Sequence, residues 1–229
     1  KMEETEVCFL MDRFGYMKLI DKNAYERNKE AAHNENRCVF LCMNTDKICI
    51  FTDKGKMHSI KAADIPLVRF RDKGTPADNL SNYDSSQERM LYVAPLGQIR
   101  QDQLLFVTRA SMCKLVEGTE FDVAKRTIAA TKLAQDDELV FVGSAGEMEQ
   151  VVFQSNGGYF LRFLKQEIST ARRAALGVHG MKLAQEDYVE HAYLLSGHQE
   201  YAISYHDREY PLNKVRLGKR DTRGIKPRS

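Results

Sequence analysis

The sequence contains no tryptophan and no apolar run long enough to span a bilayer. The absence of tryptophan, together with the absence of a Gly-His and Trp-Asp pattern, excludes a WD40 propeller. The first residues, KMEETEVCFL, show no basic stretch followed by an apolar core, so we expect no secretory signal. We therefore expect a cytoplasmic protein that makes no use of a membrane.

Cysteine is scarce and its spacing is irregular. The five cysteines include no Cys-x-x-Cys pair, and they are Cys8, Cys38, Cys42, Cys49 and Cys113. An odd number with this spacing argues against a disulfide framework and against a zinc site. Three of them lie among valine, phenylalanine, leucine and isoleucine, which is typical of reduced thiols packed in strands.

Catalytic motifs are also missing. None of the six histidines falls at a His-Glu-x-x-His or similar metal-binding spacing, and there is no Gly-x-Ser-x-Gly motif. The turn GSAGEMEQ lacks the Lys-Ser/Thr pair that a phosphate-binding loop requires. We expect no catalytic residue, metal or cofactor in this chain.

Charge is balanced in total but unevenly distributed. With 34 basic and 32 acidic residues the net charge is +2, which does not by itself indicate a nucleic-acid-binding protein. The C-terminal end is different, because only Glu209 and Asp221 oppose its basic side chains. Those basic residues are Arg208, Lys214, Arg216, Lys219, Arg220, Arg223, Lys226 and Arg228.

One phrase of the sequence occurs twice. KLAQDDELVFV begins at Lys132, and KLAQEDYVEHAYLL begins at Lys182. Such self-similarity is the signature of a repeat architecture. In both copies an acidic turn leads into an apolar strand, and RMLYVAPL occupies the same place in an earlier copy.

A second recurring pattern is a β-rich run, a polar turn and another β-rich run, which predicts a β-hairpin. Aligning the turns gives steps of 40, 56, 47 and 51 residues between Gly15, Gly55, Ser111, Gly158 and Glu209. A third pattern is a basic residue followed by a small one. It runs from Lys125 to Ala129, Arg173 to Gly177 and Arg220 to Gly224, with a looser copy from Arg71 to Gly74.

These patterns predict an all-β domain over residues 1–229, made of about five four-stranded antiparallel units. The expected repeats cover roughly residues 5–36, 37–97, 101–146, 149–197 and 199–229. Radial packing would bury the sheet faces against their neighbours and leave only short edges. The polar stretch DKNAYERNKEAAHNENR is expected to be a loop or a turn of helix.

Basic residues at matched positions would form a ring of positive charge that suits a phosphate backbone. Candidates after the hairpin turns are Lys18, Lys56, Lys114 and Arg162. Candidates at the basic-small pattern and the C-terminal end are Arg71, Lys73, Lys125, Arg126, Arg172, Arg173, Lys219, Arg220, Arg223 and Lys226. A register slip of one residue would exchange outward and inward faces, so sequence alone does not rank them.

The order of these motifs resembles a known family. FTDKGKMHSIKAADIP, RFRDKGTPADNL, LLFVTRASMCKL, VVFQSNGGYFLRF and LGVHGMKLAQEDYV look like the C-terminal domain of the A subunit of bacterial type IIA topoisomerases, DNA gyrase and topoisomerase IV. RFGYMKLIDKNAYERN is similar to the family's first blade, through Gly15, Tyr16, Lys18, Tyr25 and Arg27. The resemblance runs from about Glu6 to Arg228.

The resemblance implies a β-pinwheel, in which propeller-like blades exchange strands with their neighbours. It also implies sequence-independent binding and bending of duplex DNA, which directs DNA crossings to the catalytic core for ATP-dependent strand passage. The implied partners are duplex DNA, the ATPase B subunit of the enzyme and the rest of its A subunit, at the nucleoid in the cytoplasm. The strand-passage tyrosine and the ATPase site belong to other parts of the enzyme.

One departure from the family pattern concerns the glycine- and arginine-rich box that gyrase carries after the first blade's Tyr-Arg pair. Here that place reads NKEAAHNENR, from Asn28 to Arg37, without Gly-Gly and with little positive charge. Residues Lys219 to Gly224, KRDTRG, only partly match the box. The sequence therefore favours a topoisomerase IV-like subunit or a gyrase paralogue that has lost the box.

Two other propeller classes remain as alternatives. A kelch-type protein-interaction propeller fits the repeat length. A propeller enzyme would need inward-facing acids or histidines at matched positions of several blades. The recurrent acids, Asp136, Asp137, Glu186 and Asp187, are instead expected in turns.

Overall fold

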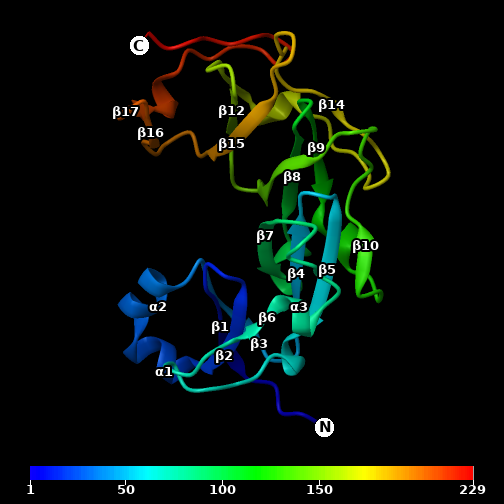
Figure 1. Cartoon of the computed structure of the whole chain (residues 1–229), viewed down its shortest axis with the longest axis vertical. Coiled ribbons are helices and arrows are strands. Elements are labelled where there is room, and N and C mark those ends of the chain that lie inside the picture. The colour runs from blue at the N-terminus through cyan, green and yellow to red at the C-terminus, as the bar shows by residue number, and fades with distance from the viewer. Residues whose placement is uncertain (229) are drawn as a thin grey trace.

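The computed structural model describes residues 1–228 and shows five antiparallel β-sheets that follow one another along an arc (Figure 1). The N-terminal sheet and the C-terminal sheet lie at opposite ends of this arc, and within the described residues they share no strand. The all-β expectation is confirmed. In the same residues, no helix combines the length and the apolar character that crossing a membrane would require.

Each sheet contains one β-hairpin. The pairs are β1 (Glu6–Met11) with β2 (Tyr16–Asp21), β4 (Lys47–Thr52) with β5 (Lys56–Lys61), β8 (Gln103–Thr108) with β9 (Met112–Glu117), β12 (Gln150–Ser155) with β13 (Phe160–Leu164), and β16 (Ala202–Tyr205) with β17 (Arg208–Pro211).

The turns of the first four hairpins lie where the sequence predicts them. Gly15, Gly55, Ser111 and Gly158 all have positive φ, a backbone conformation that favours glycine. The fifth turn, expected around Asp207, Arg208 and Glu209, lies at His206 and Asp207, which have positive φ, and Arg208 and Glu209 already belong to β17.

A third strand pairs with the first strand of each of the first four hairpins. These strands are β3 (Cys38–Met43), β7 (Met90–Pro95), β11 (Leu139–Ser144) and β15 (Val189–Leu195). Along the chain, β3 contacts β7, β7 contacts β11 and β11 contacts β15. Figure 1 shows β7 on the inner side of the arc, so the third strands line that side.

The outer edge of each of the first three sheets comes from the following repeat. The strands β6 (Thr75–Pro76), β10 (Thr127–Ala129) and β14 (Val178–His179) pair with β2, β5 and β9. In the fourth sheet, single bridges join Ile225 to Phe160 and Leu217 to Arg162. We name the segments 62–81, 118–131, 165–181 and 212–225 the first to fourth rim segments.

This exchange of edge strands is the β-pinwheel arrangement, and it changes the expected strand count. The first three sheets have four strands, the fourth has three and the fifth has two, where about five four-stranded blades were expected. Each of the first four sheets draws on two successive repeats of the sequence, so the repeat divisions do not coincide with the sheets.

Helices are few and short. The polar stretch expected as a loop or a turn of helix forms two short helices, α1 (Lys22–Arg27) and α2 (Lys29–Glu35). The carboxylate of Asp21 accepts the backbone N–H of Ala24 at 2.8 Å and so begins α1. Ala24, Tyr25 and Ala32 pack against Phe70 of the first rim segment. Two further short helices are α3 (Ala77–Leu80) and α4 (Leu96–Ile99).

Every rim segment begins with a turn of 3₁₀ helix directly after the hairpin. These turns are Ala62–Asp64, Gly118–Phe121, Lys165–Glu167 and Leu212–Lys214. They redirect the chain from its own sheet toward the edge of the preceding sheet.

The core is divided into clusters that lie mainly between neighbouring sheets. Phe51 of the second sheet contacts Phe106 of the third and Phe121 of the second rim segment, with ring centroids 6.1 and 5.1 Å apart. All five cysteines are free thiols, as expected, and burial raises the pKa of Cys8, Cys42, Cys49 and Cys113 to about 12.

Gly177 is required where the third rim segment approaches β9. Its φ is +96°, and a side chain there would overlap the carbonyl of Cys113. We expect Gly177→Ala to lower the free energy of unfolding by about 3 kcal/mol or more, because strain and a backbone clash add. Gly15→Ala is the control, since Gly15 also has positive φ but a side chain there would meet only Met90 Cε, at an ordinary contact distance of 3.9 Å. Urea unfolding of both variants tests this, and equal losses would contradict it.

Candidate functional site

Pairs of adjacent basic residues recur on the rim segments. They are Lys125–Arg126, Arg172–Arg173 and Lys219–Arg220, and we name them the rim doublets. The first members, Lys125, Arg172 and Lys219, are exposed, and within residues 1–228 their side chains make no hydrogen bond. The second members are held by the protein, because their guanidinium groups donate to backbone carbonyls. Each doublet therefore presents its first cation to solvent and bonds its second to a backbone carbonyl.

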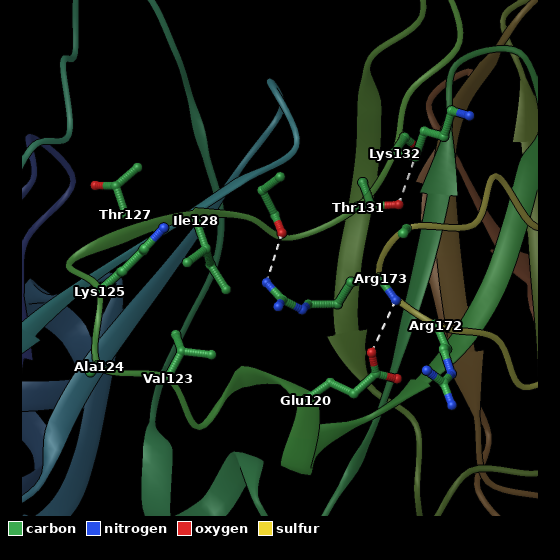
Figure 2. A pocket seen from close by; sticks show the side chains of 12 residues that line it. Glu120, Val123, Ala124, Lys125, Thr127, Ile128, Thr131, Lys132, Arg172 and Arg173 are labelled. Atoms are coloured by element: carbon green, nitrogen blue, oxygen red, sulfur yellow. Dashed lines mark hydrogen bonds between the residues drawn. The ribbon is translucent and has the colours of Figure 1, made fainter.

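A groove runs between the second and third rim segments, and Figure 2 shows its lining. It encloses about 970 Å³, and its cationic residues are Lys125, Lys132, Arg172 and Arg173. The acid in its lining, Glu120, accepts the backbone N–H of Arg173 at 3.2 Å. Apolar side chains of Val123 and Ile128 complete the lining. The lining of the groove thus carries an excess of positive charge.

Two further hollows extend the same surface. One, of about 340 Å³, shares Thr127, Ile128, Ala129 and Thr131 with the first groove and adds Lys54 and Lys56 from the second hairpin. The other, of about 800 Å³, lies along the fourth rim segment and is lined by Arg216, Lys219 and Arg223. Figure 1 shows β10 and β14 on the convex side, so these basic grooves follow the outer edge of the arc.

Lys114 was predicted to bind DNA at the surface, but the structure shows that it is buried. Its side chain is 1% exposed, and its ammonium group donates to the carbonyls of Arg172, Arg173 and Ala175 at 2.9, 2.9 and 2.7 Å. Burial lowers the pKa of Lys114 to about 8, while nearby Glu120 acts in the opposite direction. An ammonium group with all three protons committed is unavailable to a DNA phosphate.

Lys18 has the same internal role in the first sheet. Its ammonium group donates to the carbonyls of Phe70 and Asp72 at 2.6 and 2.8 Å, and burial lowers its pKa. Lys18, His58 and Lys114 each lie three residues after a hairpin turn residue of positive φ. The side chains at this recurring position, where DNA contacts were predicted, therefore bind the rim segments.

Arg162 is displaced by one position from that recurrence. It lies four residues after Gly158, and its guanidinium group donates to Gln150 Oε1 and the Val215 carbonyl, both at 2.8 Å. It is half-buried. The sequence alignment treated Arg162 as equivalent to Lys114, but the register of β13 places its neighbour Leu161 there.

The remaining predicted residues are on the surface. Lys56 is exposed, Lys73 lies 5.2 Å from the centre of the Tyr16 ring, and Arg71 pairs with Glu35 at 3.4 Å. Arg223 and Lys226 both lie over the ring of Tyr159, at 5.6 and 5.8 Å.

Sequence reasoning missed Lys132 and Lys182, the first residues of the twice-written phrase. Both are exposed, and their backbone N–H groups bond to the next rim segment at Arg173 and Thr222, at 2.9 and 2.8 Å. Their place in the repeated phrase was the available signal. Arg69 was not among the predicted residues; it is exposed and lies two residues after Leu67, as Arg172 does after Thr170 and Lys219 after Leu217.

The model of the family described as DNA gyrase C-terminal domain, beta-propeller, matches residues 46–85, 102–145 and 149–196. Together these ranges cover more than half of the chain. The chain belongs to the DNA gyrase C-terminal domain family.

The curated relatives of this gyrase-family domain are A subunits of DNA gyrase and of DNA topoisomerase 4. The A subunit of DNA gyrase from Clostridium acetobutylicum is 27% identical over 78% of the chain and 23% of the relative, and that from Ureaplasma parvum is 25% identical over 96% and 28%. The A subunit of DNA topoisomerase 4 from Bacillus subtilis is 28% identical over 66% and 19%. The chain spans about a quarter of the length of these relatives.

Solved structures show the same fold for the gyrase-family domain. The C-terminal domain of a DNA topoisomerase IV has a TM-score of 0.84 at 23% identity, covering 98% of the chain and 73% of that structure. The E. coli ParC C-terminal domain has a TM-score of 0.74 at 14% identity, covering 97% and 94%. The kelch alternative receives no support from these matches.

Replacing Lys114 by methionine tests its internal role in the gyrase-family domain. We expect a loss of about 2–4 kcal/mol in the free energy of unfolding, because three buried carbonyls lose their donor. The pKa of Lys114 is about 8 in the folded domain and 10.5 ordinarily, so the unfolded chain binds more protons between these values. The contribution of Lys114 to stability therefore rises with pH across that window.

Urea unfolding of the parent and of Lys114→Met, below pH 8 and between about pH 8 and 10, measures both effects. Equal pH slopes in the two proteins would contradict the shifted pKa.

Proposed function

We propose that this domain binds duplex DNA along the convex rim, without sequence preference, and bends it. The observation that carries the proposal is the row of exposed first members of the rim doublets beside positively charged grooves. Lys125, Arg172 and Lys219 lie on three successive rim segments, so their spacing follows the arc. A curved row of cations matches a curved phosphate backbone.

The physical basis of this binding is the release of counterions from DNA. Each phosphate that a lysine or arginine neutralises frees condensed cations, and the resulting affinity depends on salt and not on base sequence. A net charge of only +2 does not oppose this, since the basic residues outnumber the acids in both grooves, where Glu120 and Glu167 are the acids of the lining.

The domain's place in a larger enzyme follows from its family. We propose that it is part of the A subunit of a type IIA topoisomerase, where it directs DNA crossings to the catalytic core. In this proposal the B subunit supplies ATP hydrolysis, and the domain itself needs no cofactor and performs no bond chemistry. The working location is the nucleoid, in the cytoplasm.

The first repeat supports a topoisomerase IV-like role over a gyrase role. Where gyrase carries its glycine- and arginine-rich box, this chain forms α2, and its Lys29 pairs with Glu26 at 3.5 Å. A short helix of mixed charge offers little attraction to a second turn of DNA. We therefore propose that the domain bends DNA without the tight wrap that drives negative supercoiling.

Binding to duplex DNA is expected to weaken steeply with salt. The logarithm of the association constant should fall linearly with the logarithm of salt concentration, with a slope of about −0.9 for each phosphate contacted. Fluorescence anisotropy with two labelled duplexes of unrelated sequence measures this. A flat salt dependence, no binding at low salt, or a strong preference for one duplex would overturn the proposal.

Removing exposed rim cations should reduce the salt slope. We expect Lys125→Gln, Lys132→Gln and Arg172→Gln together to lower its magnitude by about three, because three phosphate contacts are lost. The control carries the same charge loss on the helices of the first repeat, at Lys22, Arg27 and Lys29. If both triple variants lose equal affinity and slope, binding is not localised to the rim.

A further inference from the structure

The second members of two rim doublets join neighbouring rim segments. The guanidinium group of Arg173, on the third rim segment, donates to the carbonyl of Ala129 on the second at 3.0 Å. The guanidinium group of Arg220, on the fourth, donates to the carbonyl of His179 on the third at 2.7 Å. Each arginine thus bridges one junction between blades.

At each of these two junctions, a glutamate of the preceding rim segment also accepts a hydrogen bond from the backbone of the arginine. The backbone N–H of Arg173 donates to Glu120 at 3.2 Å, and that of Arg220 donates to Glu167 at 3.1 Å. Glu120 and Glu167 are the third residues of their respective 3₁₀ turns and lie 47 residues apart, the same separation as Arg173 and Arg220. We name each reciprocal pair, Glu120 with Arg173 and Glu167 with Arg220, a rim strap.

The first rim segment has no preceding rim segment, and a different residue stands at the position of Arg173 and Arg220. Parallel bridges align Leu67, Thr170 and Leu217, and three residues further on lie Phe70, Arg173 and Arg220. Phe70 is buried against the first-repeat helices. The arginine is therefore present where a preceding rim segment offers a carbonyl and is replaced by an apolar residue where none exists.

Arg126 makes a looser version at the junction between the first and second rim segments. It is exposed, and it donates to the carbonyl of Leu80 at 2.9 Å. The residue that corresponds to Glu120 is Asp64, one methylene shorter. The two complete straps are therefore those of the second and third rim junctions.

Because of their position, the straps can constrain the angle between neighbouring blades. Apolar packing between sheets is non-directional, so it fixes the distance between blades better than their angle. A charge-assisted hydrogen bond has a defined length and direction. The straps lie at the rim, on the outer side of the sheets, while the third strands lie in contact on the inner side.

We propose that Arg173 and Arg220 set the angle between successive blades and thereby the curvature that the rim imposes on bound DNA. The part concerning DNA rests on the proposed function, whereas the part concerning the blade angle does not. The two members of a rim doublet then have separate roles. The first, Arg172 or Lys219, holds phosphate, and the second positions the first.

Two charge-matched double variants separate these roles. Arg173→Gln with Arg220→Gln removes two charges and both straps, and Arg172→Gln with Lys219→Gln removes two charges from adjacent positions and leaves the straps. The first readout is the radius of gyration of the free domain by small-angle X-ray scattering. The second is energy transfer between fluorophores at the two ends of a short duplex at saturating protein.

The strap variant should show a changed radius of gyration and a loss of the energy transfer that reports bending. The adjacent variant should bind more weakly, with a salt slope smaller by about two, but bend DNA as the parent does once saturated. Returning the charge and a donor with Arg173→Lys and Arg220→Lys should restore part of the energy transfer. Identical scattering and identical energy transfer in the two Gln variants would overturn the proposal.

Thermal unfolding by circular dichroism checks that the variants are folded. If the double strap variant does not fold, Arg173→Gln against Arg172→Gln decides the question at one junction. If the parent itself binds no DNA, the proposed function fails, but the scattering comparison still decides whether the straps set the blade angle.

Discussion

The exchange of edge strands is the constraint on which the rest of this structure depends. Each of the first four hairpins exposes an outer edge that the next repeat completes, through bonds such as Leu19 N–H to the Pro66 carbonyl at 3.0 Å and Leu115 N–H to the Ser169 carbonyl at 3.2 Å. A sheet of this protein is therefore unfinished until the following repeat has folded. The segment that finishes it also carries the exposed cations of the rim.

Because the exchanged segments form the rim, surface charge and architecture are encoded in the same short stretch. Lys18 and Lys114 bind backbone carbonyls of the first and third rim segments from the inside, while Lys125, Arg172 and Lys219 extend from the second, third and fourth rim segments toward solvent. A recurring basic residue in such a chain has two possible meanings. Only the direction of its side chain, which the strand register sets, distinguishes them.

Much of the fold was predictable from local signals. Gly15, Gly55, Ser111 and Gly158 mark turns because positive φ is costly for most residues, and the strands on either side are strongly apolar. The exchanged strands were not readable from local pattern, since β6 and β14 have two residues each and carry no periodicity. The surface was predicted less well: Arg162 was aligned one position out of register, and Arg69 matched none of the recurring patterns.

The contacts that hold each rim segment differ from sheet to sheet. Lys18 donates to two carbonyls and Lys114 to three, while His58 of the second sheet contacts the hydroxyl of Thr127 and the carboxylate of Glu88, both at 2.9 Å. A rim segment moved from the second sheet to the first or third would meet a lysine in place of a histidine. The blades are therefore not fully interchangeable, because buried His58 pairs with the Thr127 side chain of the second rim segment, whereas Lys18 and Lys114 pair with backbone carbonyls.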